Sequence, residues 1–205
     1  MKRIVLITLF STFSLITMSL LAQSKSFIQR VSLEAGVGYN IAVSPDRGTS
    51  TDNFSGFRNI NLGTNYAIND LVGLRFTYGN SAFKDKDDNS MGLTLHRFIA
   101  EVTFNVIESV EMDRNPFEVV AHAGAGISLG KSKLSSAIDK MGTVQVGVMP
   151  LYRLSDNFSL HLDASYVINI RQNYFYDGRQ TNPDGSHAIG EYFMLNLGLG
   201  VIFGF

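Results

Sequence analysis

Apolar and polar side chains alternate along the last segment of the chain, residues 192–205, more clearly than anywhere else in the sequence. Every second residue from Phe193 to Phe205 is apolar, and the positions between them are mostly small or polar. A side-chain period of two is that of a β-strand whose two faces meet different surroundings. The apolar row is longer than a soluble strand of about five or six residues requires. It suits a strand tilted across a hydrocarbon layer, which takes about 9–11 residues.

The same alternation recurs upstream and predicts eight strands in all. They are expected at 30–41, 59–68, 72–79, 97–106, 117–129, 143–154, 158–169 and 192–205. Pro150 cannot donate a backbone hydrogen bond, so we expect a bulge beside it. The sequence therefore predicts an all-β fold, an eight-stranded antiparallel transmembrane β-barrel.

The connections between these strands differ in length, as they do in transmembrane barrels, where outer loops are long and periplasmic turns short. We expect short turns at 69–70 and 155–157, and a connection at 107–116 that is long for a periplasmic turn. The long outer loops are expected at 43–58, 80–91, 130–142 and 170–191. The last of these carries three aromatic residues, 174–176, for a partner contact or an interfacial girdle.

The N-terminus indicates export. Lys2 and Arg3 precede an apolar stretch that ends at Ala22, which is typical of a secretory signal peptide over residues 1–22. The alternative is an uncleaved anchor helix. Residues 23–205 then form one outer-membrane β-barrel domain, and the absence of cysteine excludes a disulfide framework. At the other end, Phe203 and Phe205 resemble the terminal aromatic signal that the outer-membrane insertion machinery reads.

The strand faces also predict what fills the lumen. A net charge of −1 gives no electrostatic case for nucleic acid. Charged residues of both signs fall on the inward face, where they pair with one another or line a water-filled path. An eight-stranded barrel is just wide enough for side chains to fill, which favours an ion-pair plug. The predicted lumen ion-pair network comprises Arg30, Glu34, Arg75, Arg97, Glu101, Glu118, His122, Arg153, His161 and Asp163.

Neither a metal site nor a catalytic site is expected. The loop 84–90 has EF-hand-like acidic spacing, but Ser90 replaces the required glycine and His96 the bidentate glutamate. A hydrolase needs a nucleophile beside an oriented base. The candidates are Ser159, His161, Asp163 and Ser165 on one strand, and Asp184, Ser186 and His187 in a loop; both sets are better explained by ion pairing and loop polarity.

Several short motifs in the second half carry a family resemblance. They are H-A-G-A-G at 122–126, K-M-G at 140–142, P-L-Y-R-L-S-D at 150–156, L-D-A-S at 162–165, N-I-R-Q-N-Y at 169–174 and D-G at 177–178. In order and spacing they resemble the barrel domain of the OmpA-like outer-membrane proteins of Bacteroidetes-type bacteria. Full-length members continue into a peptidoglycan-binding domain, whereas this chain ends at Phe205. The resemblance implies the barrel and its outer-membrane location, without catalytic residues or the envelope-tethering role.

The leading hypothesis is a non-enzymatic outer-membrane barrel with a structural or interaction role, or an accessory subunit of a larger complex. A narrow channel is the second hypothesis, and a lipid-modifying enzyme the third. The expected partners are outer-membrane lipids and lipopolysaccharide, the insertion machinery during assembly, and other outer-membrane proteins. No cofactor and no nucleic acid are expected.

Overall fold

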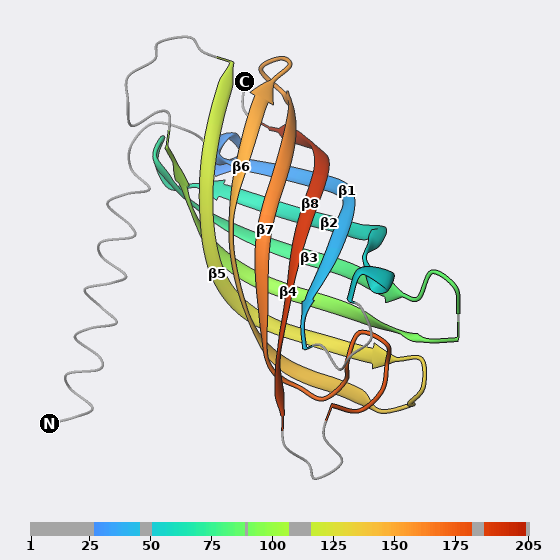
Figure 1. Cartoon of the computed structure of the whole chain (residues 1–205). Coiled ribbons are helices and arrows are strands. Elements are labelled where there is room, and N and C mark those ends of the chain that lie inside the picture. Colours follow the sequence, from blue (N-terminus) through green and yellow to red (C-terminus); the bar gives the residue numbers. More distant parts are fainter. Residues whose placement is uncertain (1–26, 46–50, 89, 107–115, 182–186, 204–205) are drawn as a thin grey trace, which may run out of the picture.

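Eight antiparallel strands close into a barrel in which each strand pairs with its neighbours in sequence and the last returns to the first (Figure 1). The computed structural model describes residues 27–45, 51–88, 90–106, 116–181 and 187–203. The strands are β1 (Val31–Ser44), β2 (Gly56–Ala67), β3 (Val72–Lys84), β4 (Gly92–Asn105), β5 (Phe117–Ser132), β6 (Ile138–Arg153), β7 (Phe158–Gln172) and β8 (Ala188–Ile202). The predicted all-β barrel is confirmed.

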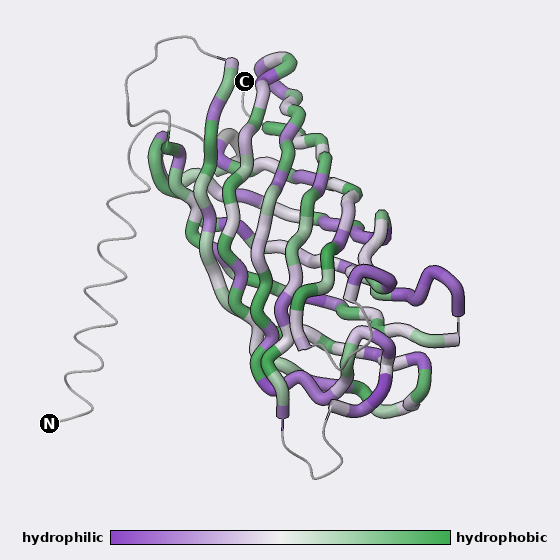
Figure 2. The backbone as a smooth tube through the Cα atoms, viewed as in Figure 1, coloured by the Kyte–Doolittle hydropathy of each residue, from purple (hydrophilic) through white to green (hydrophobic). Residues whose placement is uncertain are grey.

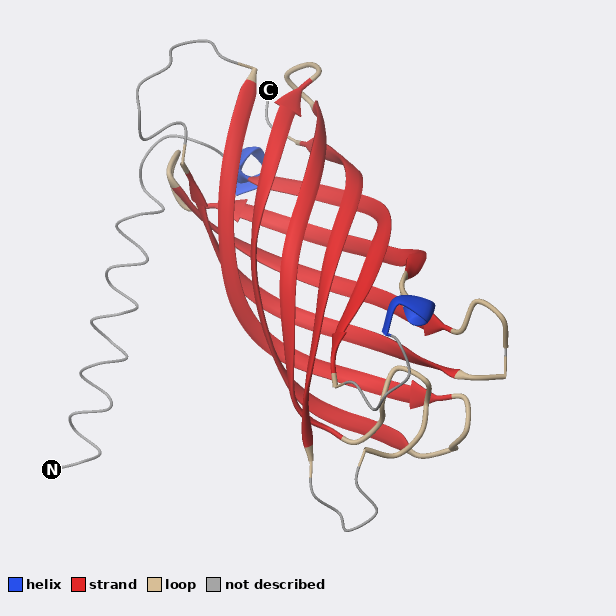
Figure 3. Ribbon diagram, in the orientation of Figure 1, coloured by secondary structure: helices blue, strands red, loops and turns tan. Residues whose placement is uncertain are grey.

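Little besides strand is present in the part of the chain that the structure describes, as Figure 3 shows. Two short 3-10 turns, η1 (Phe27–Arg30) and η2 (Thr51–Phe54), flank the first two strands. None of the described helices has the length and hydropathy to cross a bilayer. The predicted signal peptide, residues 1–22, and Phe205 lie outside the described residues, and Phe203 follows the end of β8.

The apolar rows face outward and the polar rows face the lumen. On β8, Leu195, Leu197 and Leu199 are 46%, 54% and 55% exposed, whereas Asn196 between them is 1% exposed. Figure 2 shows the same alternation of hydrophobic and hydrophilic positions along the strands. An exterior that is apolar around the whole circumference requires a hydrocarbon solvent, and this is the arrangement of a transmembrane barrel.

The strands extend further toward the outer loops than the sequence predicts. The expected loops at 80–91 and 130–142 shrink to 85–91 and 133–137, because β3, β5 and β6 continue into them, and β4 begins at Gly92 rather than at the expected residue 97. In these extensions apolar side chains also occupy the inward face and polar ones the outward face. Phe83, Leu95 and Met141 point inward and are buried, while His96 and Lys140 point outward. The rule that apolar side chains face lipid therefore fails at this end.

The bulge expected at Pro150 is absent. Its register with β5 is continuous, and β6 and β7 keep one register from Gly142 to Arg153. Proline is tolerated there because the missing N–H lies where residues 149 and 150 have no ladder partner on β7. Register shifts occur instead within β1, at Gly38/Asn40 and Ala42/Ser44, and before Gln172 on β7.

The inward apolar side chains form a compact cluster near the outer mouth of the barrel. Its buried members are Ala42, Phe54, Phe83, Leu93, Leu95, Met141, Val167, Tyr176, Tyr192 and Met194. They come from six strands, η2 and the β7–β8 loop. Polar side chains such as Asn59 and Ser81 lie among these residues, and below the cluster the lumen is lined mainly by polar and charged side chains. The cluster is called the apolar layer below, and the lumen beneath it the polar layer.

Leu95 tests whether the apolar layer stabilises the barrel. We expect Leu95→Ala to lower the free energy of unfolding by about 2–5 kcal/mol, because the fully buried side chain leaves a cavity that lipid cannot enter. Urea titration in lipid vesicles, followed by gel mobility of the folded barrel, measures this. Leu197→Ala is the control, since lipid fills the space it vacates; equal losses in both variants would contradict the prediction.

Candidate functional site

The centre of the polar layer is Arg75 on β3, whose side chain is fully buried. Its Nε lies 2.5 Å from Glu34 Oε1, its Nη2 lies 2.8 Å from Asp163 Oδ2, and its Nη1 lies 3.5 Å from Glu101 Oε2. One guanidinium therefore joins carboxylates from β1, β4 and β7 across the lumen. Because water does not reach these charges, each depends on the others for compensation.

His122 on β5 is the second bridge between the carboxylates. Its Nδ1 lies 2.8 Å from Glu101 Oε1, and its Nε2 lies 3.4 Å from Asp163 Oδ1. Glycines make room for this packing, since a side chain at Gly147 would overlap the His122 ring. Glu34, Arg75, Glu101, His122 and Asp163 are called the ionic hub below.

Neutral side chains complete the hub, and no charge pattern in the sequence marks them. Gln145 Nε2 donates to Glu101 Oε1 at 2.9 Å, Asn65 Nδ2 donates to Glu34 Oε2 at 3.1 Å, and Ser165 Oγ donates to Asp163 Oδ1 at 2.5 Å. With these contacts the hub connects β1 through β7. Their only sequence signal is an inward position on a predicted strand.

The ten predicted lumen residues do not form one network. Glu118 and Arg153 make a separate ion pair, in which the Arg153 side chain is half exposed. Arg30 donates to the backbone oxygen of Ile68 at 2.8 Å. His161 is buried, but no ion pair joins it to the hub carboxylates within the described residues. The structure thus brings five of the ten together, and these five form the ionic hub.

Arg97 is the clearest departure from the predicted pairing. Its side chain is fully buried, yet no carboxylate of the described residues lies within ion-pair distance. Instead Nη1 donates to the Tyr192 hydroxyl at 2.6 Å and Nη2 to Asn61 Oδ1 at 3.4 Å. Because Tyr192 belongs to the apolar cluster, Arg97 connects the two layers of the interior.

Residues 173–181 of the β7–β8 loop fold over the outer mouth. The Tyr176 ring packs on Phe83 with ring centroids 4.4 Å apart, and its hydroxyl donates to the Glu191 backbone oxygen at 2.7 Å. The N–H of Gly92 donates to Asp177 O, and Ser132 Oγ donates to Gly178 O. The aromatics expected to form a partner contact or girdle thus include one, Tyr176, that is buried inside the outer mouth.

The described residues contain no group of three or more His, Asp or Glu side chains that could hold a metal ion. In the 85–91 loop, Asp85 Oδ1 accepts from the N–H groups of Asp87 and Asp88, which shapes a turn. Hydrogen bonds from Ser90 lower the pKa of Asp88 below its ordinary value. These carboxylates are thus engaged in local turn structure.

The comparisons with known proteins give the fold. No protein-family model and no curated protein matches the chain. Neisserial surface protein A is similar in structure at 18% identity, covering 84% of this chain and 96% of that one, with a TM-score of 0.55. A major outer membrane protein from Thermus thermophilus is 14% identical, covering 83% and 97%, with a TM-score of 0.50. The fold is that of the small outer-membrane barrels.

Arg75 is the residue on which the ionic hub depends most. We expect Arg75→Ala to cost about 3–5 kcal/mol of unfolding free energy, because it leaves three buried carboxylates without their common cation. Arg153→Ala should cost about 1 kcal/mol or less, because that pair is partly hydrated. Urea titration in vesicles compares them, and a loss in Arg75→Ala no larger than in Arg153→Ala would refute the assignment.

The cover over the mouth should be sensitive to alkali. Burial, together with nearby Tyr192 and Glu191, raises the pKa of Tyr176 well above its ordinary value near 10. The unfolded chain ionises this phenol first, so stability falls as pH rises above about 10. We expect Tyr176→Phe to lose less stability than the wild type between about pH 8 and pH 11, measured by urea titration; identical losses would contradict this.

Proposed function

We propose that this protein is a non-enzymatic outer-membrane barrel with a closed lumen and a structural or interaction role. Its short motifs resemble the OmpA-like barrels of Bacteroidetes-type bacteria, and its fold agrees with that resemblance. The observation that carries the proposal is the double closure of the interior. The ionic hub crosses the polar layer, and the apolar cluster with Tyr176 fills the outer mouth.

The closed lumen argues against the narrow channel. Arg75, Arg97, Leu93 and Leu95, which together span both layers, are all fully buried. An ion crossing the barrel must break the hub and also pass the packed apolar cluster at the outer mouth, where loss of hydration opposes its entry. A cavity of about 270 Å³ opens among residues such as Asn65, Asn105 and Arg153 at the end opposite the apolar cluster, and it stops below the hub.

The placement of the candidate catalytic residues supports a role without catalysis. Ser159, His161, Asp163 and Ser165 are 4% exposed or less, and Asp163 is bound by Arg75 and Ser165. A lipid ester reaching this set must enter a filled lumen. In the loop set, His187 contacts Asn173 and Arg171, while Asp184 and Ser186 lie outside the described residues.

The surfaces left for function are the outer loops and the lipid-facing exterior. On this proposal the protein is exported by a cleaved signal peptide and placed in the outer membrane by the insertion machinery, which reads Phe203 and Phe205. Lipopolysaccharide surrounds its outer half, and another outer-membrane protein replaces lipid if it serves as an accessory subunit.

Planar-bilayer recording separates the closed barrel from the channel. We expect no stepwise conductance from the wild type, from Arg75→Ala or from Glu101→Ala, because the apolar layer remains when the hub is broken. Gel mobility of the same samples establishes that each barrel is folded. Conductance steps in the folded wild type that change with either substitution would establish the channel and reject the closed-barrel proposal.

A further inference from the structure

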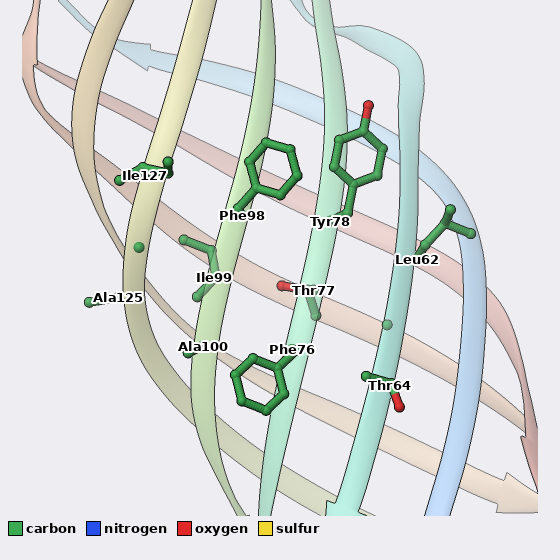
Figure 4. Close-up of a pocket in the computed structure, with 12 residues that line it drawn as sticks. Leu62, Thr64, Phe76, Thr77, Tyr78, Phe98, Ile99, Ala100, Ala125 and Ile127 are labelled. Carbon is green, nitrogen blue, oxygen red and sulfur yellow. The ribbon is translucent and has the colours of Figure 1, made fainter.

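The lipid-facing surface of β2–β5 contains a hollow of about 550 Å³. Figure 4 shows Leu62, Tyr78, Phe98 and Ile127 in one row across these strands, with Phe76, Ala100 and Ala125 in the row below. The register aligns both rows, so Ala100 and Ala125 lie side by side between large side chains. Two methyl groups leave a depression there, bordered by the exposed rings of Phe76 and Phe98.

Small side chains continue the hollow toward the outer mouth. Ile127 pairs with Gly142 on β6, and a Cβ placed on Gly142 would meet nothing nearer than Ile170, 4.0 Å away. Two residues beyond Gly142 on the same outward face is Lys140. Gly142 thus leaves an open position between the edge of the hollow at Ile127 and the exposed ammonium group of Lys140.

The outward-facing charges at the outer ends of β3–β6 are all positive: they are Lys84, Lys131 and Lys140. Lys131 and Lys140 are exposed, and neither forms an ion pair with a carboxylate of the described residues. Among the acids at this end of the barrel, Asp139 faces inward and binds Asn173, Asp88 lies near Lys133, and Asp85 accepts backbone N–H groups within the 85–91 loop. Lys131 and Lys140 are therefore two neighbouring exposed ammonium groups without a carboxylate partner among the described residues.

Hydrogen-bonding side chains lie between the hollow and the lysines. Tyr78 Oη lies 2.9 Å and Asn80 Nδ2 lies 3.2 Å from His96 Nδ1. Hydrogen-bonding groups thus begin one row above the apolar hollow, as they do where headgroups meet acyl chains.

We propose that this face binds one phosphorylated, multiply acylated lipid of the outer leaflet, with an acyl chain in the hollow and phosphate at Lys131 and Lys140. Lys140 lies four residues beyond the Ala125 row, about 13 Å along the strand. That distance fits within one leaflet, half of a hydrocarbon core about 30 Å thick. The inference rests on the proposed outer-membrane location and adds a defined lipid site to it.

Native mass spectrometry of the full barrel in detergent micelles tests the site, with purified diphosphoryl lipid A, phosphatidylglycerol and phosphatidylcholine as probes. We expect lipid A to bind most tightly and one molecule to remain bound. Lys131→Ala/Lys140→Ala should weaken lipid A binding about thirtyfold through lost charge. Ala100→Leu/Ala125→Leu should weaken it about fivefold by filling the hollow.

Matched controls carry the same chemical changes elsewhere. Each control makes one substitution of the same kind: Lys86→Ala removes one lysine from the exposed 85–91 loop, and Ala164→Leu adds one leucine side chain to the outward face of β7. Both should bind lipid A as the wild type does. Equal binding of the three lipids, wild-type affinity in either double variant, or an equal loss in the controls would overturn the proposal.

The same samples distinguish this inference from the proposed function. A folded, non-conducting barrel that binds lipid A no better than phosphatidylcholine rejects the lipid site alone. A folded barrel that conducts ions rejects the closed-barrel proposal, whereas the effects of the lysine and alanine substitutions still decide the lipid site.

Discussion

The structure depends on compensating the charge of Arg75 inside a lumen that water does not reach. Lipid on the exterior forces the polar faces of the strands inward, and the narrow barrel then brings their charges within contact distance. Glu34, Glu101 and Asp163 meet the guanidinium from three other strands. The ion pairs in the interior therefore require one particular register of the strands. Shifting a strand by one residue would turn its carboxylate toward lipid and place an apolar side chain in the lumen.

Two layers divide the interior between them, and each is held by a different kind of interaction. The ionic hub holds the middle of the barrel through electrostatic contacts, and the apolar cluster closes the outer mouth through packing. Arg97 joins them through Tyr192. On the proposed function, contacts with other molecules fall to the loops and to the lipid-facing side, where the hollow at Ala100 and Ala125 lies.

Sequence alternation predicted the eight strands and their lipid-facing sides, because a period of two follows from strand geometry alone. It could not predict the outer ends. There Phe83 and Leu95 turn inward under the β7–β8 loop, and hydropathy cannot distinguish burial under a loop from exposure to lipid. It also could not separate the hub from Arg97 or from the Glu118–Arg153 pair, since height along the lumen depends on the stagger between strands. The pattern of charged residues in the sequence also could not identify Gln145 and Ser165 as hydrogen-bond donors to the hub, because both side chains are neutral.

The cover contributed by residues 173–181 has a consequence for the order of assembly. Tyr176 packs on β3, while its hydroxyl bonds to the backbone of β8. Phe83 on β3 therefore lacks its packing partner, Tyr176, until the hairpin of β7 and β8 is in place. Packing of Tyr176 inside the outer mouth is therefore coupled to closure of the barrel by β8. An assembly intermediate that lacks β8 would expose the apolar side chains of the outer mouth to water.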